Sequence, residues 1–123
     1  MTTTSGAAHW SGRLPDSCDV IEIGTTTVDV GAALTALRER GYSVLLTEGG
    51  PHLMADLLEA RVLDEAFITV SPVIAGRDTE QRLGMVAGVE FLPSTQISAE
   101  MVSVRRQADF LFLRYDFRNS AKP

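Results

Sequence analysis

The stretch LLTEGGPHLMADLLEA, residues 45–60, decides how this chain folds. An apolar run ends in a carboxylate, Glu48, and the glycines and proline of residues 49–51 follow before apolar residues recur at helical spacing. Glycine permits a sharp change of direction, and proline suits the first turn of a helix, where its missing N–H is not needed. The stretch therefore predicts a strand, a tight loop and a helix over about residues 52–60.

The loop between this strand and this helix has two interpretations. It is a tight turn, or it is an anion site, because the first amides of a helix are free and the helix dipole adds partial positive charge there. Gly49 and Gly50 lack a Cβ, so a phosphate can approach their backbone and a positive φ costs little. The amides of residues 52–54 would be the donors. The stretch is neither a GxGxxG motif nor a P-loop.

The polar side chains around the loop also have two interpretations each. Glu48, at the carboxyl end of the apolar strand, is either a ligand-facing hydrogen-bond acceptor or a paired structural group. His52 contacts an anion or lies in solvent. Residues 64–65, Asp-Glu, are typical of turn capping and solvation. Arg77 and Arg82 flank an Asp/Thr/Glu-rich loop and are either phosphate ligands or surface side chains.

Upstream of the loop, the pattern alternates between strand and helix. The short apolar segment Val20–Ile23 predicts a strand. Asp29 is a good N-cap for a helix whose apolar residues recur until Gly41 ends it as the C′ residue. Residues 42–47, YSVLLT, predict a second strand, and their continuous apolar run indicates burial on both faces. Strand, helix and strand in this order predict a parallel pair with a right-handed crossover.

Downstream of residue 60 the pattern changes to strands with short connections and no helical period. Four segments are strand-like: EAFITVSPVIAG (65–76), FLPSTQIS (91–98), MVSVRR (101–106) and FLFLRYDF (110–117). The last is apolar on both faces at its centre, so we expect it inside the sheet and not at an edge. The predicted fold class is α/β, a mixed sheet with a parallel βαβα start and antiparallel C-terminal strands.

Composition excludes several classes of function. The 123 residues predict one domain, and a net charge of −5 without any Lys/Arg run argues against nucleic-acid and membrane-surface binding. Cys18 is the single cysteine, so it forms no internal disulfide and no CxxC zinc site, and we expect a small loop or strand-edge residue. No apolar stretch is long enough to span a membrane, and the N-terminus is not a secretory signal, so we expect a cytoplasmic protein without a metal site. The composition of residues 1–12 predicts a disordered or loosely attached arm.

The segment VLLTEGGPHLMADLLEARVLDEAFITVSPVIAG, residues 44–76, resembles the signature of the riboflavin-pathway pyrimidine reductases. These are the C-terminal reductase domain of the bifunctional deaminase/reductase and its stand-alone relatives, which share the dihydrofolate-reductase-like fold. The helix-forming segment upstream and the closing ADFLFLRYDF are similar to the family as well. The resemblance covers about residues 13–118, and its combination of motifs is more specific than EGGP alone.

The resemblance implies a reaction and a site. The family uses NADPH to reduce the ribosyl group of 5-amino-6-(5-phosphoribosylamino)uracil-type pyrimidines to a ribityl chain. The glutamate of the motif, here Glu48, lies at the substrate in such proteins. The loop and helix start hold the NADPH phosphates, and the matching residues here are Gly49, Gly50, Pro51, His52, Leu53, Met54, Ala55 and Asp56. This chain departs from the family at His52, where a small hydroxylic residue is common, and at residues 75–77, where the family often has Gly-Gly.

Family domains are longer, so the resemblance implies that the N-terminal strands are missing and that residues 13–118 form a partial reductase domain. Residues 1–12 would be an arm and residues 119–123 a tail. Strands without neighbours would leave apolar edges, for which we expect a homodimer. Four interpretations stay open. The first two are the pyrimidine reductase and a non-catalytic dinucleotide-binding or assembly module of the same fold. The others are a truncated product with no stable activity and a dihydrofolate reductase-like oxidoreductase, which the EGGP and DE motifs fit less well.

Overall fold

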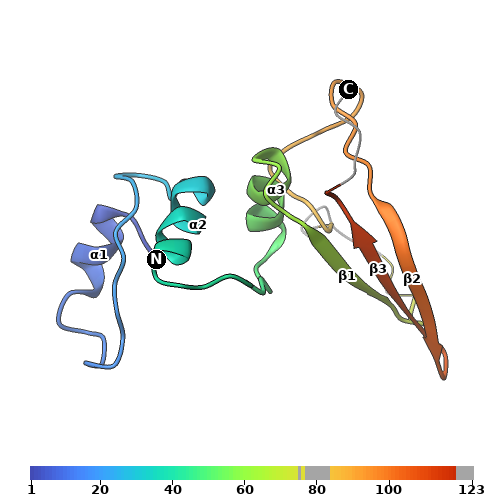
Figure 1. Cartoon of the computed structure of the whole chain (residues 1–123), viewed down its shortest axis with the longest axis horizontal. Helices are drawn as coiled ribbons and strands as arrows, with labels where there is room; N and C mark the ends of the chain where they lie inside the picture. The colour runs from blue at the N-terminus through green and yellow to red at the C-terminus, as the bar shows by residue number, and fades with distance from the viewer. Residues whose placement is uncertain (75, 77–83, 119–123) are drawn as a thin grey trace. The chain divides into compact units, whose positions relative to one another are not determined.

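The computed structural model of the chain describes residues 1–74, 76 and 84–118. It consists of two compact units, Met1–Glu48 and Gly49–Pro123. The first unit contains α1 (Thr4–Trp10) and α2 (Val30–Glu39), and the second contains α3 (Pro51–Glu59), β1 (Glu65–Val70), β2 (Glu100–Gln107) and β3 (Phe110–Asp116), as labelled in Figure 1.

Helix α1 lies within the segment for which the composition predicts a disordered arm. Thr3 caps this helix, because its side-chain oxygen accepts a hydrogen bond of 3.2 Å from the N–H of Gly6. Thr2 is also tied down: its N–H donates to the carbonyl of Ile21 at 3.0 Å, and its own carbonyl accepts from Ile23 at 2.8 Å. These bonds attach the first residues to the rest of their unit, which a composition rich in small residues does not reveal.

The predicted strand Val20–Ile23 is present only as a single parallel bridge between Thr2 and Glu22. The predicted strand over residues 42–47 is absent, and Val44 and Leu46 are 88% and 81% exposed. A strand needs a neighbour that exchanges ladder hydrogen bonds with it. The first unit, which is described throughout, contains no strand that could serve, so the predicted parallel βαβα start is wrong for this structure.

Helix α2 forms where the sequence predicts it. Asp29 accepts a hydrogen bond of 2.7 Å from the N–H of Ala32 through Oδ1, as expected of an N-cap. At the other end Gly41 has a φ of +89°, and the N–H groups of Gly41 and Tyr42 donate to carbonyls of the last helical turn at 2.9 and 3.2 Å. This arrangement is a Schellman motif, and it confirms Gly41 as the C′ residue.

Helix α3 begins directly after the two glycines. It also ends in a Schellman motif, but its C′ residue is Arg61 and not a glycine. Arg61 has a φ of +53°, and its N–H donates to the carbonyl of Leu58 at 3.1 Å. The next N–H, that of Val62, donates to the carbonyl of Leu57 at 3.1 Å. The chain then enters β1 four residues after Arg61, so the C-terminal end of α3 and the start of β1 are held close together.

The second unit contains a three-stranded antiparallel sheet of order β1-β3-β2, seen side by side in Figure 1. The central position of β3 confirms the prediction that residues 110–117 lie inside the sheet. Register places Ile68 opposite Leu113, which in turn lies opposite Val104. Cross-strand partners share a face, so one face of the sheet carries this apolar row.

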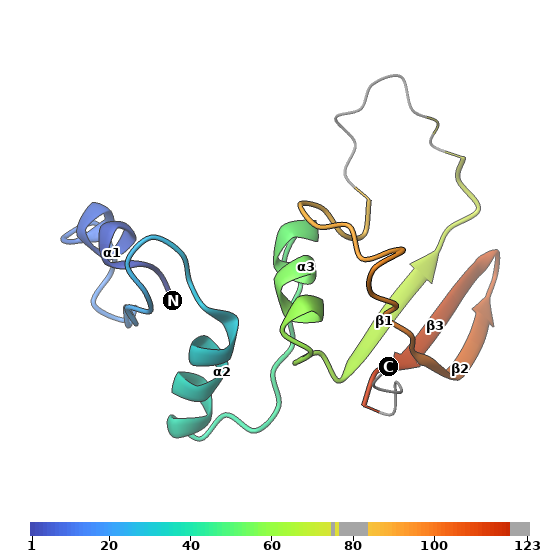
Figure 2. The same cartoon turned by 90° about the horizontal axis from the view of Figure 1, so that it is seen from above.

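The connection into β2 differs from the prediction. Residues 91–98, predicted as a strand, contain a turn over residues 92–94 and no strand, and the N–H of Thr95 donates to the carbonyl of Phe91 at 2.6 Å. Pro93 cannot donate to a ladder, which explains why this apolar segment does not join the sheet. Figure 2 shows the segment before β2 passing beside α3, and an Ala87 N–H to Pro51 carbonyl bond of 3.2 Å fixes that contact.

Few apolar side chains are buried in the described part of the chain: Ile23, Ala55, Leu57, Leu58 and Ala66. Most large apolar residues of the sheet keep a substantial exposed fraction, led by Phe67 at 70%. Within the described residues, none of the helices has the length and apolar character that crossing a membrane requires.

Candidate dinucleotide site at the start of helix α3

The start of α3 presents backbone donors without a capping side chain. Gly50 is the N-cap, with φ −74° and ψ 179°, and it has no side chain to accept from the first turn. Pro51 follows at the first helical position and has no N–H. The first intrahelical bond runs from the N–H of Met54 to the carbonyl of Gly50, at 3.1 Å, so the amides of His52 and Leu53 precede the helical ladder.

The two glycines have different roles, and neither needs a positive φ. Gly49 and Gly50 are not among the described residues with a positive φ, so neither uses that freedom of glycine here. A Cβ on Gly49 would collide with the side chain of Leu53, so Gly49 allows Leu53 to lie against the backbone. A Cβ on Gly50 would meet nothing within 4 Å, which leaves open space in front of the helix start.

His52 is exposed and lies next to Gly88, a residue of the segment that leads toward β2. A Cβ built on Gly88 would come within 2.9 Å of His52 Nδ1 and 3.3 Å of its Cε1. The imidazole therefore rests against the backbone of Gly88, beside the helix start.

The other residues predicted to bind the cofactor differ in how far they are buried. Leu53 and Asp56 are exposed, Met54 is half-buried, and Ala55 is 4% exposed within the small core. The side chain of Ala55 packs inward, so this part of the helix faces the protein and not a ligand.

Glu48 is exposed and is the last residue of the first unit, whereas Gly49 begins the second. The boundary between the units thus falls inside the EGGP motif. Arg77 and Arg82, considered as phosphate ligands, lie outside the described residues, as does most of the departure at residues 75–77.

An ion-pair network that the sequence did not indicate lies at one end of the sheet. Arg114 donates to Glu65 through Nε at 2.9 Å and through a terminal guanidinium nitrogen at 2.6 Å. Arg118 donates to Asp116 through its backbone N–H at 2.8 Å and through its guanidinium, and also reaches Glu65 at 3.3 Å. Register pairs Glu65 with Asp116 on adjacent strands, so the two arginines offset a pair of like charges.

The network lowers the pKa of both carboxyl groups. The hydrogen bonds from Arg114 are the largest cause for Glu65, and those from Arg118 are the largest cause for Asp116. Asp116 is a buried residue at 8% exposure, and its oxygens are satisfied. The network therefore joins β1 to the end of β3 and has a structural role. The sequence could not show it, because its partners are up to 53 residues apart.

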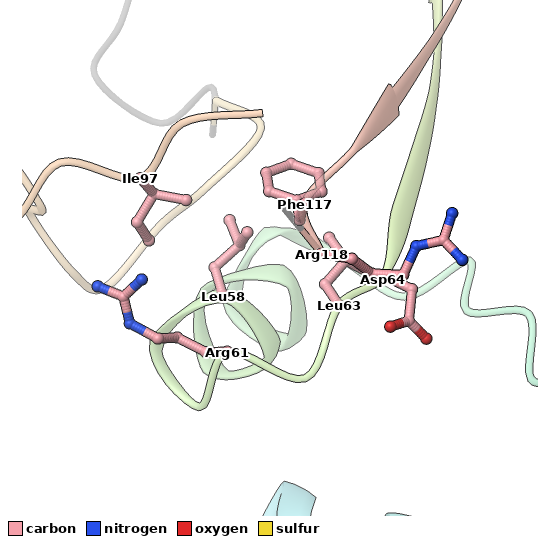
Figure 3. A pocket seen from close by; sticks show the side chains of 7 residues that line it. All are labelled: Leu58, Arg61, Leu63, Asp64, Ile97, Phe117 and Arg118. Carbon is pink, nitrogen blue, oxygen red and sulfur yellow. The ribbon is translucent and has the colours of Figure 1, made fainter. Parts of the chain in front are cut away.

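A hollow of about 170 Å³ lies at the opposite end of α3 from the glycines. Figure 3 shows Leu58, Leu63, Ile97 and Phe117 around it, with Arg61 on one side and Asp64 and Arg118 on the other. Its lining combines these four apolar side chains with three charged ones, of which Arg118 is engaged with carboxylates. The hollow is not part of the predicted site. Among the described residues, no group of three or more His, Cys, Asp or Glu could hold a metal ion.

The residues at the start of α3 fit a phosphate group. Backbone amides, an imidazole and open space at Gly50 together suit an anion, and the positive end of the helix dipole lies there.

Two comparisons with known proteins bear on the chain. The sequence model of the RibD C-terminal domain family matches residues 1–104, most of the chain, including α3 and its glycines. The search of curated proteins returned no significant match.

Proposed function

Because the chain belongs to the RibD C-terminal domain family, we propose that it is an NADPH-dependent reductase of riboflavin biosynthesis. Its substrate would be a 5-amino-6-(5-phosphoribosylamino)uracil-type pyrimidine, whose ribosyl group is reduced to a ribityl chain. The observation that carries the proposal is the EGGP motif at the start of α3, within the residues that match the family.

In this proposal residues Gly49–Asp56 hold the phosphates of NADPH. Support comes from the amides of His52 and Leu53, which precede the helical ladder, and from the open space at Gly50. Leu53 and Met54 would contribute backbone, whereas the buried Ala55 would contribute only by packing the helix. The bound cofactor would supply the hydride, and the chain would position it.

Glu48 would face the substrate as a hydrogen-bond acceptor, next to the phosphate loop in sequence. We propose residues 13–118 as the reductase segment, in a cytoplasmic protein that forms a homodimer. The exposed apolar residues of the sheet support the association.

The proposal is tested by mixing the purified chain with NADPH and the ribosylaminopyrimidine and following the loss of NADPH absorbance. We expect oxidation of NADPH that depends on both the chain and the pyrimidine, with ribitylaminopyrimidine as the product. Dihydrofolate is the control substrate, because turnover of dihydrofolate instead would assign the chain to the dihydrofolate reductases.

A second candidate function is a non-catalytic dinucleotide-binding or assembly module. The exposure of Val44, Leu46 and Phe67, at 88%, 81% and 70%, favours it, because large apolar side chains at such exposure are typical of association surfaces. Saturable binding of NADPH without any turnover at high chain concentration would select this function over the reductase.

A further inference from the structure

The segment Gly84–Gly88 contacts the first turn of α3 at two points. The N–H of Ala87 donates to the carbonyl of Pro51 at 3.2 Å, and the next residue, Gly88, lies against the imidazole of His52. Gly88 has a φ of +89°, a conformation that residues with a Cβ rarely adopt. The two contacts place Ala87 and Gly88 against Pro51 and His52, the first two residues of α3.

The contact with His52 depends on the missing Cβ of Gly88. A Cβ at this position would lie 2.9 Å from Nδ1, closer than such atoms come in proteins, and 3.3 Å from Cε1. No other imidazole atom is within 4 Å of that position, so the Nδ1 edge of the ring faces Gly88 and Nε2 lies farther from it. Any side chain at residue 88 would require the ring to move.

We propose that Gly88 is a positioning residue, which holds the His52 imidazole at the start of α3 and thereby sets how firmly a phosphate is bound there. This inference rests on the proposed function, whose site it deepens. An exposed imidazole that lies against the Gly88 backbone has fewer orientations open to it, so it loses less conformational freedom when it donates to a phosphate oxygen. The effect of such preorganisation on affinity is roughly two- to tenfold.

The first test is the NMR spectrum of the imidazole rings. The chain has two histidines, His9 and His52, so the His9 signals serve as an internal reference. We expect a nuclear Overhauser contact between the His52 ring and the Gly88 Hα protons in the unmodified chain. We also expect Gly88→Ala to shift the His52 ring signals and leave those of His9 in place.

The second test measures NADPH affinity by calorimetry in a double-mutant cycle. Gly88→Ala should weaken binding roughly two- to tenfold when His52 is present and have no further effect after His52→Ala. Gly84→Ala is the matched control, because a Cβ at Gly84 would meet only the carbonyl of Val86, at an ordinary 3.7 Å. Gly41→Ala controls for backbone strain, since Gly41 shares the φ of +89° and a Cβ there would meet nothing.

Three results would overturn the positioning role: no Overhauser contact, unchanged His52 signals in Gly88→Ala, or a loss of affinity in Gly88→Ala that is equally large with His52 present and after His52→Ala. The Overhauser contact is measured in the unmodified chain, so it decides the matter even if Gly88→Ala does not fold. If the chain binds no NADPH while the ring signals behave as expected, the proposed function fails and the Gly88–His52 contact stands.

Discussion

Gly50 offers a clean probe of the proposed site because its backbone is unstrained and no described atom would meet its Cβ. Gly50→Ser keeps a good N-cap and brings a hydroxyl that accepts from the amides of the first turn. We expect the free energy of unfolding to stay the same or rise slightly, while NADPH affinity falls about tenfold because the hydroxyl occupies the phosphate donors. Calorimetric titration and urea unfolding measure the two quantities.

Gly50→Val is the companion variant, and its predicted effect on stability has the opposite sign. Valine is a poor N-cap and should cost up to about 1 kcal/mol of unfolding free energy, and it should abolish NADPH binding by filling the open space. If both variants bind NADPH as well as the unmodified chain, the loop is only a tight turn and the site lies elsewhere.

Arg61 and Gly41 occupy the same C′ position after their helices, with φ values of +53° and +89°. A left-handed conformation is unfavourable for arginine and costs glycine almost nothing. We therefore expect Arg61→Gly to raise the free energy of unfolding of the second unit by roughly 0.5–1 kcal/mol.

The reciprocal variant, Gly41→Ala, should lower the free energy of unfolding by roughly 1 kcal/mol, because it places a Cβ in the same conformation. Urea unfolding followed by circular dichroism measures both changes. A destabilised Arg61→Gly chain would show that the arginine side chain contributes more than its backbone strain removes.

At the scale of the elements, the network of Glu65, Asp116, Arg114 and Arg118 joins β1 to β3. The folded pKa values of Glu65 and Asp116 lie below their ordinary values of 4.5 and 3.8. The unfolded chain therefore binds more protons than the folded chain as the pH falls through this range. The stability that the network provides is complete above the ordinary values and is lost progressively below them.

We predict that the urea midpoint is nearly constant from about pH 7 to about pH 5 and then declines toward about pH 3. Combining Glu65→Gln with Asp116→Asn should flatten this decline, because the two carboxyl groups no longer change protonation. Glu59→Gln, which removes an exposed carboxylate on α3, is the matched control and should leave the decline in place. An equally steep decline in the double variant would contradict the assignment to this network.

The elements differ in how far the sequence predicted them. Helices α2 and α3 have local signals, namely Asp29 as N-cap, Gly-Pro at the start of α3 and apolar residues at helical spacing, so they were predicted correctly. Of the four segments predicted as C-terminal strands, three correspond to β1, β2 and β3, whereas residues 91–98 form no strand. The strands expected at residues 20–23 and 42–47 failed, since an apolar run does not reveal whether a partner strand is available.

For the site, the sequence predicted the position of the loop before α3 but not its detailed geometry. It could not show that Gly88 faces His52, because 36 residues separate them and no periodicity joins them. The pairing of Glu65 with Arg114 could not be predicted either, because the two residues are 49 positions apart and only the register of β1 and β3 brings them together.

At the scale of the whole molecule, the two edges of the described sheet differ. Strand β2 carries Arg105 and Arg106 and a bulge between Met101 and Ser103, features that discourage strands from pairing edge to edge. Strand β1, of sequence EAFITV, has no basic residue and exposes Phe67 and Val70. The edge of β1 is therefore the better candidate for contact with a second copy of the chain.

We predict that the chain elutes as a dimer in size-exclusion chromatography with light scattering. Val70→Lys should convert it to a monomer, because a charge on β1 opposes edge pairing. Val102→Lys on β2 is the control and should leave the dimer intact. A monomeric unmodified chain would contradict this prediction and would also remove the basis for an assembly module.

The strand order β1-β3-β2 has a consequence for how the second unit folds. Strands β2 and β3 are joined by only Ala108 and Asp109, so their hairpin closes locally and forms on the microsecond scale. Strand β1 joins β3 only after residues 71–109 have been looped out, which costs chain entropy before any contact repays it. Amide hydrogens of the hairpin should therefore become protected from exchange during refolding before those of β1 do.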